Sequence, residues 1–222
     1  MPFKHLLVLL FIMATHGSAF PVAKLALNNS VPPILMASLR MGLVLIILIP
    51  FWKFKIPEKK YLQPLFAFSI SMGVLVYVFM NLSLKYSDFI SPIIIGSQLA
   101  IPFGVLASSL MIGENISLKK WFFVFTALMG IVIVFFDPTL KNNLLGLFYA
   151  TLMAFFFALA QVYSRKLRDL NIATINAFTG VFGFFILILI SFFIDVTFLL
   201  SKPHGIIFSY GLRELFILIE NP

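Results

Sequence analysis

Long apolar stretches recur along the whole chain and constrain its fold more than any other feature. A helix needs about 20 apolar residues to cross a hydrocarbon core about 30 Å thick. Seven stretches are long enough, or nearly so, for one crossing each: residues 6–27, 33–51, 64–84, 89–112, 121–136, 144–164 and 172–194. A weaker stretch at 206–219 carries Arg213 and Glu214 near its middle. The pattern predicts an all-α, polytopic bundle of membrane helices.

The composition excludes a soluble fold. Hydrophobic residues make up 61% of the 222 residues and charged residues 11%, against about 25% charged in an ordinary soluble domain. A soluble chain of this size buries only about 70% of its surface and could not hide so much apolar area. The net charge of +8 is therefore interpreted as basic loops at a lipid bilayer rather than as a nucleic-acid interface. The sequence has no cysteine, which excludes a thiolate metal site and a cysteine nucleophile.

The distribution of lysine and arginine between the loops predicts the orientation of the chain. Cytoplasmic loops of membrane proteins are enriched in these residues. With the N-terminus in the cytoplasm, ten basic residues fall on the inner side: Lys4, Lys53, Lys55, Lys59, Lys60, Lys119, Lys120, Arg165, Lys166 and Arg168. Three fall on the outer side: Lys85, Lys141 and Lys202. We therefore expect a multi-pass protein with a cytoplasmic N-terminus.

A weak internal repeat relates two parts of the chain. An offset of about 141 residues aligns 19–25 with 160–166, and each segment closes an apolar span with a basic residue. Five spans per repeat is an odd number, so the second copy would be inverted in the membrane. We predict a first five-helix repeat over 1–137 and a partial second repeat over 144–222, with two full helices and an incomplete third. The chain would then be a truncated copy of a ten-helix protein. Its first span also fits a signal peptide, but its part in the repeat favours retention.

Four short motifs occur in an order and spacing that resemble a known family. The motifs are Ala14–Lys24, Pro32-Pro33 with Leu39-Arg40, Ile112-Gly113-Glu114 with Ser117, Trp121 and Gly130, and Tyr163–Leu167. Together they resemble the EamA family of the drug/metabolite transporter superfamily over roughly residues 6–195. One departure is His16, where that family commonly has Trp. The resemblance implies a secondary carrier of small metabolites with ten helices, a central cavity between inverted halves and a place in a prokaryotic inner membrane.

Polar and aromatic residues inside the apolar spans are the candidates for solute binding. A charge at the bilayer centre costs at least about 2.5 kcal/mol, so one placed there is expected to have a function. The candidate set is His16, Phe20, Lys24, Arg40, Tyr77, Asn81, Gln98 and Gln161. Structural alternatives stay open: Lys24 could reach the bilayer surface, His16 could bond between helices, and Arg40 could bond backbone carbonyls.

Two further patterns carry alternatives of their own. A stripe of residues spaced by four on the third span is expected to face inward: Ser69, Gly73, Tyr77, Asn81 and Lys85. Lining of a cavity and close helix packing explain this stripe equally well.

The sequence also places one acidic residue at a cytoplasmic turn before a helix. This residue, Glu114, is a gate or topology element, the ion-pair partner of Lys119 or Lys120, or a contact of the next helix's N-terminus. Ser117 fits an N-cap of that helix.

These observations predict a transporter rather than an enzyme. Cationic groups lie within the spans and no acidic residue lies deep in any of them, which favours an anionic or amino-acid-like solute. The predicted mechanism is alternating access around a midplane site. No nucleophile motif or H-E-x-x-H segment occurs, so we expect no catalytic residue, cofactor or metal. The alternatives are a nonfunctional truncated remnant, a membrane scaffold or assembly subunit, and, less favoured, an intramembrane enzyme. A homo-oligomer is left open.

Overall fold

The regular elements of the protein are helices throughout the described residues. The computed structural model describes residues 3–29, 31–51, 57–136 and 143–200, and no strand occurs within these ranges. The α-helices are α1 (Phe3–Asn28), α2 (Pro33–Leu48), α3 (Lys59–Ile70), α4 (Val76–Lys85), α5 (Ser91–Ser97), α6 (Ala100–Ile112), α7 (Leu118–Phe135), α8 (Leu144–Lys166) and α9 (Ile172–Leu200). A 3-10 turn, η1 (Ile49–Phe51), follows α2, and a π-helical turn, η2 (Ser71–Leu75), joins α3 to α4. The all-α prediction is confirmed.

Helices occupy all seven predicted apolar stretches. By length and composition, five helical segments are able to cross a membrane: His5–Asn28, Lys59–Lys85, Ser91–Ile112, Leu144–Lys166 and Ile172–Phe193. The apolar helix Pro33–Leu48 is shorter, and α7 fills the fifth predicted stretch with 18 residues. The polytopic bundle is therefore confirmed, while the weaker stretch at 206–219 lies outside the described residues.

Proline explains two interruptions of the predicted spans. The α2 helix ends earlier than expected and continues as the 3-10 turn η1, in which Pro50 has no N–H to donate to the carbonyl of Ile46, four residues earlier. Pro102 has no N–H to donate to the carbonyl of Gln98, four residues earlier. The Ile101 N–H donates to that carbonyl instead, at 3.1 Å, and the predicted fourth span is divided into α5 and α6. The α6 helix ends at Gly113, whose φ of 74° is left-handed and suits glycine at a helix C-terminus.

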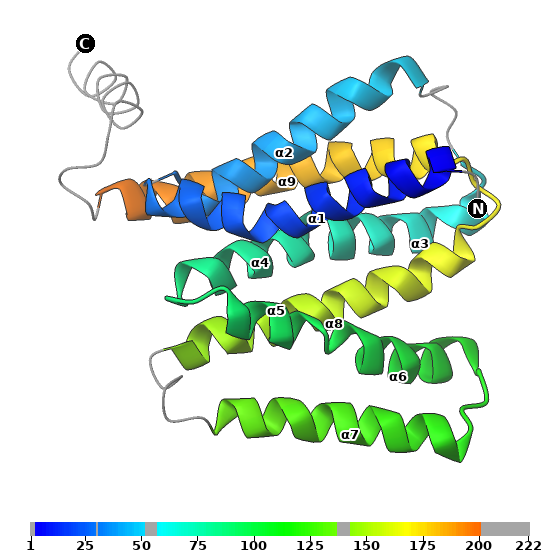
Figure 1. Ribbon diagram of the computed structural model, residues 1–222. Helices are drawn as coiled ribbons and strands as arrows, with labels where there is room; N and C mark the ends of the chain where they lie inside the picture. The colour runs from blue at the N-terminus through cyan, green and yellow to red at the C-terminus, as the bar shows by residue number, and fades with distance from the viewer. Residues whose placement is uncertain (1–2, 30, 52–56, 137–142, 201–222) are drawn as a thin grey trace, which may run out of the picture.

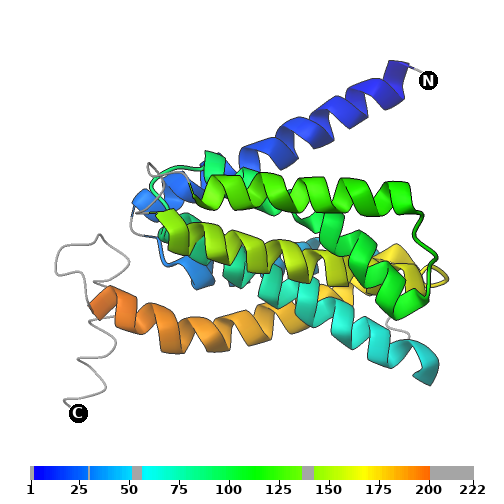
Figure 2. The same ribbon diagram turned by 90° about the horizontal axis from the view of Figure 1, so that it is seen from below.

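The helices lie side by side, and α7 stands at one edge of the bundle (Figure 1). The α2 and α9 helices pack along each other, and α8 contacts α3, α4, α5 and α6. The first half of α1 projects away from the other helices (Figure 2), and its side chains from His5 to Thr15 are exposed. The core that surrounds the candidate site is a cluster formed by Ala23, Leu27, Val76, Met80, Leu84, Ile93, Ala150 and Met153.

A close approach of helices in this bundle joins α2, η2 and α9. A Cβ at Gly73 would lie 2.9 Å from the backbone oxygen of Thr179, and one at Gly183 would lie 3.0 Å from the backbone oxygen of Gly73. The Met41 side chain lies 2.9 Å from the same Gly183 position. Only glycine allows backbones to approach so closely, and these contacts fix where α9 crosses the helices that carry the candidate site.

Candidate functional site

The polar stripe predicted on the third span runs along α3, η2 and α4 and faces inward over most of its length. Ser69 is fully buried, Gly73 is buried and Asn81 is 1% exposed. The π-helical turn lies directly before Tyr77; such turns widen a helix by one residue and are frequent at functional sites. The stripe therefore lines the interior of the bundle and not its lipid-facing surface.

The two ends of this stripe differ in what they contact. Near its start, Ser69 lies 3.3 Å from the hydroxyl of Thr179 on α9, and Gly73 packs against Thr179 and Gly183. This half of the stripe is used for helix packing. Beyond it, neither Tyr77 nor Asn81 has such a hydrogen-bond partner among the described side chains of α9, so the half that contains them is the candidate for solute binding.

Arg40 lies over the face of Tyr77 in the middle of α2. Its guanidinium carbon is 5.0 Å from the ring centroid, a distance at which a cation is attracted to an aromatic face. Arg40 is the eighth of the 16 residues of α2, and its side chain is exposed. No ion pair links it to a carboxylate within the described residues. A cation at this depth is costly against lipid, which makes Arg40 a candidate for contact with water or a solute.

Asn81 lies one helical turn beyond Tyr77 and is buried with both polar side-chain atoms unpaired. Neither Nδ2 nor Oδ1 has a hydrogen-bond partner among the described residues. An unsatisfied buried donor or acceptor costs about 1–3 kcal/mol, and native structures retain such groups when they bind a water or ligand or have another function. Arg40, Tyr77 and Asn81 are therefore the candidates for solute binding: a cation over an aromatic face, and an unpaired amide one helical turn away.

Lys24 has a structural role that the sequence analysis did not foresee. Its Nζ donates to the backbone oxygens of Leu84 at 2.8 Å and Ser87 at 2.6 Å. These carbonyls follow the last turn of α4, where backbone acceptors lack helical partners and a cation is favoured. Lys24 therefore ties α1 to the end of α4.

The remaining candidates are distributed over the molecule. Phe20 is partly buried and packs against the core cluster, as Tyr77 does, so these two border the same interior region. His16 lies within α1, but its side chain is outside the described part of the structure. Gln98 is exposed at the break between α5 and α6, and Gln161 is exposed on α8. No described contact joins either glutamine to Arg40 or Tyr77.

Two polar residues at the predicted outer end are buried, and the sequence analysis proposed neither for the site. Asp195 is 2% exposed, and its Oδ2 accepts hydrogen bonds from the Leu35 N–H at 2.8 Å and from Ser191 at 2.7 Å. Asn143 is 1% exposed, and its Oδ1 accepts from the hydroxyl of Ser87 and from the backbone N–H of Asp88. The local sequence gave no sign of either partner, because both contacts join segments far apart in the chain.

The ion-pair partner of Glu114 is neither of the two lysines that the sequence suggested. Its carboxylate pairs with Arg165 at 2.7 Å, and both side chains are about half exposed, at 48%. Arg165 ends α8 on the same face of the bundle, so the pair joins the α6–α7 turn to α8 and links two of the family-like motifs. The prediction for Ser117 is confirmed, because its hydroxyl accepts the Lys120 N–H at 3.5 Å at the start of α7.

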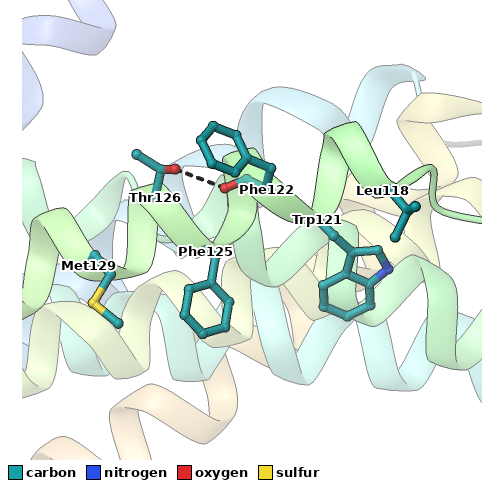
Figure 3. A pocket seen from close by; sticks show the side chains of 6 residues that line it. All are labelled: Leu118, Trp121, Phe122, Phe125, Thr126 and Met129. Atoms are coloured by element: carbon teal, nitrogen blue, oxygen red, sulfur yellow. Dashed lines mark hydrogen bonds between the residues drawn. The ribbon is translucent and has the colours of Figure 1, made fainter.

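A hollow of about 540 Å³ lies away from these residues, along α7. Its lining is Leu118, Trp121, Phe122, Phe125, Thr126 and Met129. Figure 3 shows these side chains projecting from one helix, with the Thr126 hydroxyl bonded to the Phe122 carbonyl at 2.9 Å. A groove formed by one peripheral, apolar helix matches acyl chains of lipid rather than a polar solute.

The helices and the comparison with known families define the class of protein. Several helices able to span a membrane make the chain a multi-pass membrane protein. The model of the EamA-like transporter family matches residues 3–136, more than half of the sequence. The chain belongs to this family, whose members are membrane transporters of small solutes. No curated protein matches the chain.

Proposed function

We propose that this protein is a secondary transporter of anionic or amino-acid-like solutes. The observation that carries the proposal is Arg40, a mid-helix cation that lies over Tyr77 and is paired with no carboxylate among the described residues. The fork of N–H groups on a guanidinium matches a carboxylate in two parallel hydrogen bonds. Arg40 binds the carboxylate of the solute, Asn81 bonds its polar substituent, and Tyr77 and Phe20 border its apolar part.

Alternating access is the mechanism that we propose for this site. In this mechanism two inverted repeats, residues 1–137 and 144–222, move against each other around a midplane site. The contact between α2 and α9 supports this proposal, because the offset of about 141 residues pairs the starts of these two helices and they pack together. The same proposal places the protein in a prokaryotic inner membrane with its N-terminus in the cytoplasm.

The test is solute exchange by purified protein in liposomes. Vesicles loaded with a mixture of unlabelled amino acids are given the same mixture in radiolabelled form, and label trapped inside is counted. Arg40→Gln should lower exchange about tenfold or more, because a charge-assisted hydrogen bond contributes about 1.5–3 kcal/mol. Arg168→Gln is the matched control, since Arg168 is an exposed arginine beyond α8. Exchange that is unaffected by Arg40→Gln would refute the proposed site, and absence of exchange by the unmodified protein for amino acids and organic anions alike would refute the function.

A further inference from the structure

The joint between the end of α9 and the start of α2 depends on one carboxylate. Asp195 and Leu35 are 160 residues apart in sequence, yet the Leu35 N–H donates to Asp195 Oδ2 at 2.8 Å. Leu35 lies in the first turn of α2, where backbone N–H groups lack helical partners and a negative charge is favoured. The α2 helix has no side-chain cap of its own, and Pro32 occupies the cap position. Asp195 thus caps α2 from another helix.

The second oxygen of this carboxylate is unsatisfied. Asp195 Oδ1 is buried without a hydrogen-bond partner. Among the described residues, the only other buried side-chain atoms without a partner are the two amide atoms of Asn81. A buried carboxylate is stable when all its acceptor sites are occupied, and an unpaired buried oxygen is costly. A proton bound at Oδ1 removes the charge and converts this atom to a hydroxyl group. The geometry therefore contains an acid with one oxygen engaged and one available to a proton.

Few charged groups act on Asp195. Lys85 at the end of α4 is the basic residue whose charge favours the carboxylate. The α2 helix contributes Arg40, more than one turn beyond Leu35, and the basic residues of α3, Lys59 and Lys60, begin that helix at the opposite end. Asp195 is the only charged residue in 172–200. Protonation of Asp195 therefore changes the charge at this joint by a full unit.

We infer that Asp195 is a proton-binding site that fastens α9 to α2 when ionised and releases them when protonated. The ionised form accepts the hydrogen bonds of Leu35 and Ser191 and is attracted by the positive end of α2. The neutral acid is a weaker acceptor and loses that attraction. The proton comes from the aqueous phase at this end of the bundle and binds Oδ1. The inference goes beyond the proposed function, because it concerns the opening of this joint and requires no solute.

The absence of cysteine from the chain allows a direct test of the opening. Ile34 lies beside the joint and is fully buried, whereas Phe89 is 60% exposed at the same end. An Ile34→Cys variant in liposomes is labelled with a maleimide, and its rate is divided by that of a Phe89→Cys variant to correct for thiol ionisation. Between about pH 8 and pH 5 the corrected rate should rise, by at most about tenfold per pH unit for one proton. A corrected rate that does not depend on pH would overturn the inference.

Variants at Asp195 identify the group that binds the proton. Asp195→Asn keeps an oxygen acceptor in place but cannot ionise, so the corrected I34C rate should be high and independent of pH. Asp88→Asn removes an exposed carboxylate at the same end and should leave the pH response intact. A pH response that persists in Asp195→Asn would overturn the inference. Should that variant fail to fold, Asp195→Glu decides, because it retains an ionisable group and must retain the response. The labelling needs no transport, so failure of the exchange assay and failure of this inference are distinguishable.

Discussion

Arg40 and Asn81 differ from the polar residues used in helix packing, and this difference is the reason that we propose them for solute binding. Arg40 is exposed over Tyr77, and Asn81 is buried without partners. Ser69 and Thr179, by contrast, satisfy each other across the α3–α9 contact. The difference lies in unmet hydrogen-bonding capacity, which is the property that a solute uses.

The Asn81→Leu substitution tests whether Asn81 contributes to solute binding or to the stability of the folded protein. Leucine has a similar size and no polar atoms, so the substitution removes two unsatisfied buried atoms. We expect the free energy of unfolding in detergent to stay constant or rise by up to about 1–3 kcal/mol, while solute exchange falls. The measurements are thermal unfolding followed by circular dichroism and exchange in liposomes. A strong loss of stability would show that Asn81 is satisfied in the folded protein and would argue against a binding role.

The sequence predicted single residues best where their environment is local. Ser117 was identified as an N-cap because its partner lies three residues away. Glu114, Lys24 and Asp195 each contact a group 51 or more residues away, and no local pattern encodes a contact of that range. The burial of Asp195 could not be foreseen for the same reason, because its partner is a backbone N–H at the start of α2.

At the scale of elements, glycine positions determine how the helices that carry the site cross. Gly73 on η2 and Gly183 on α9 lie where two backbones approach closely, and Thr179 and Met41 lie against them. The sequence analysis left close packing and cavity lining equally open for the stripe. The structure assigns its first half to packing, through Ser69 and Gly73.

Gly73→Ala tests this crossing, with Gly104→Ala as the matched control. The new Cβ at position 73 would lie 2.9 Å from a backbone oxygen, so α9 must shift, at a cost of about 1–3 kcal/mol. Gly104 is also inside a helix, but nothing lies within 4 Å of its Cβ position. There alanine should stabilise the helix by up to about 1 kcal/mol. Equal effects of the two substitutions on the unfolding temperature would contradict the assigned crossing.

The extent of each element was predictable wherever proline did not intervene. The long α1, α8 and α9 helices follow the predicted stretches closely. The divided α5–α6 segment was not foreseen, although Pro102 is visible in the sequence. Membrane helices tolerate proline in several ways, so the residue alone does not reveal whether a helix kinks, continues or breaks.

At the scale of the whole molecule, the polar contacts differ between the two ends of the bundle. At the predicted outer end, Lys24, Asn143 and Asp195 make contacts that are largely buried. At the predicted inner end, the Glu114–Arg165 and Tyr61–Asp169 contacts are exposed. Buried polar contacts are the more costly to break. The contacts at the predicted outer end should therefore be harder to break than those at the predicted inner end.

Single cysteines test the proposed orientation, because the chain contains none of its own. Phe89→Cys lies in the α4–α5 connection and Asn115→Cys in the α6–α7 connection, both exposed. In intact cells an impermeant maleimide should label Phe89→Cys but not Asn115→Cys. Asn115→Cys should be labelled only after the membrane has been permeabilised. The reverse pattern would refute a cytoplasmic N-terminus. Every loop assigned to the inner side would then lie on the outer side, and every outer loop on the inner side.

The central claim is that Arg40 binds the carboxylate of the solute. The most direct test removes the solute carboxylate and the Arg40 guanidinium, first separately and then together, and compares the exchange rates. The exchange assay is run with an amino acid that the protein accepts and with the amine that remains when its carboxylate is removed. The unmodified protein should exchange the amine about tenfold or more slowly, since one charge-assisted hydrogen bond contributes about 1.5–3 kcal/mol. In Arg40→Gln the two rates should become nearly equal. A ratio left unchanged by Arg40→Gln would contradict the claim.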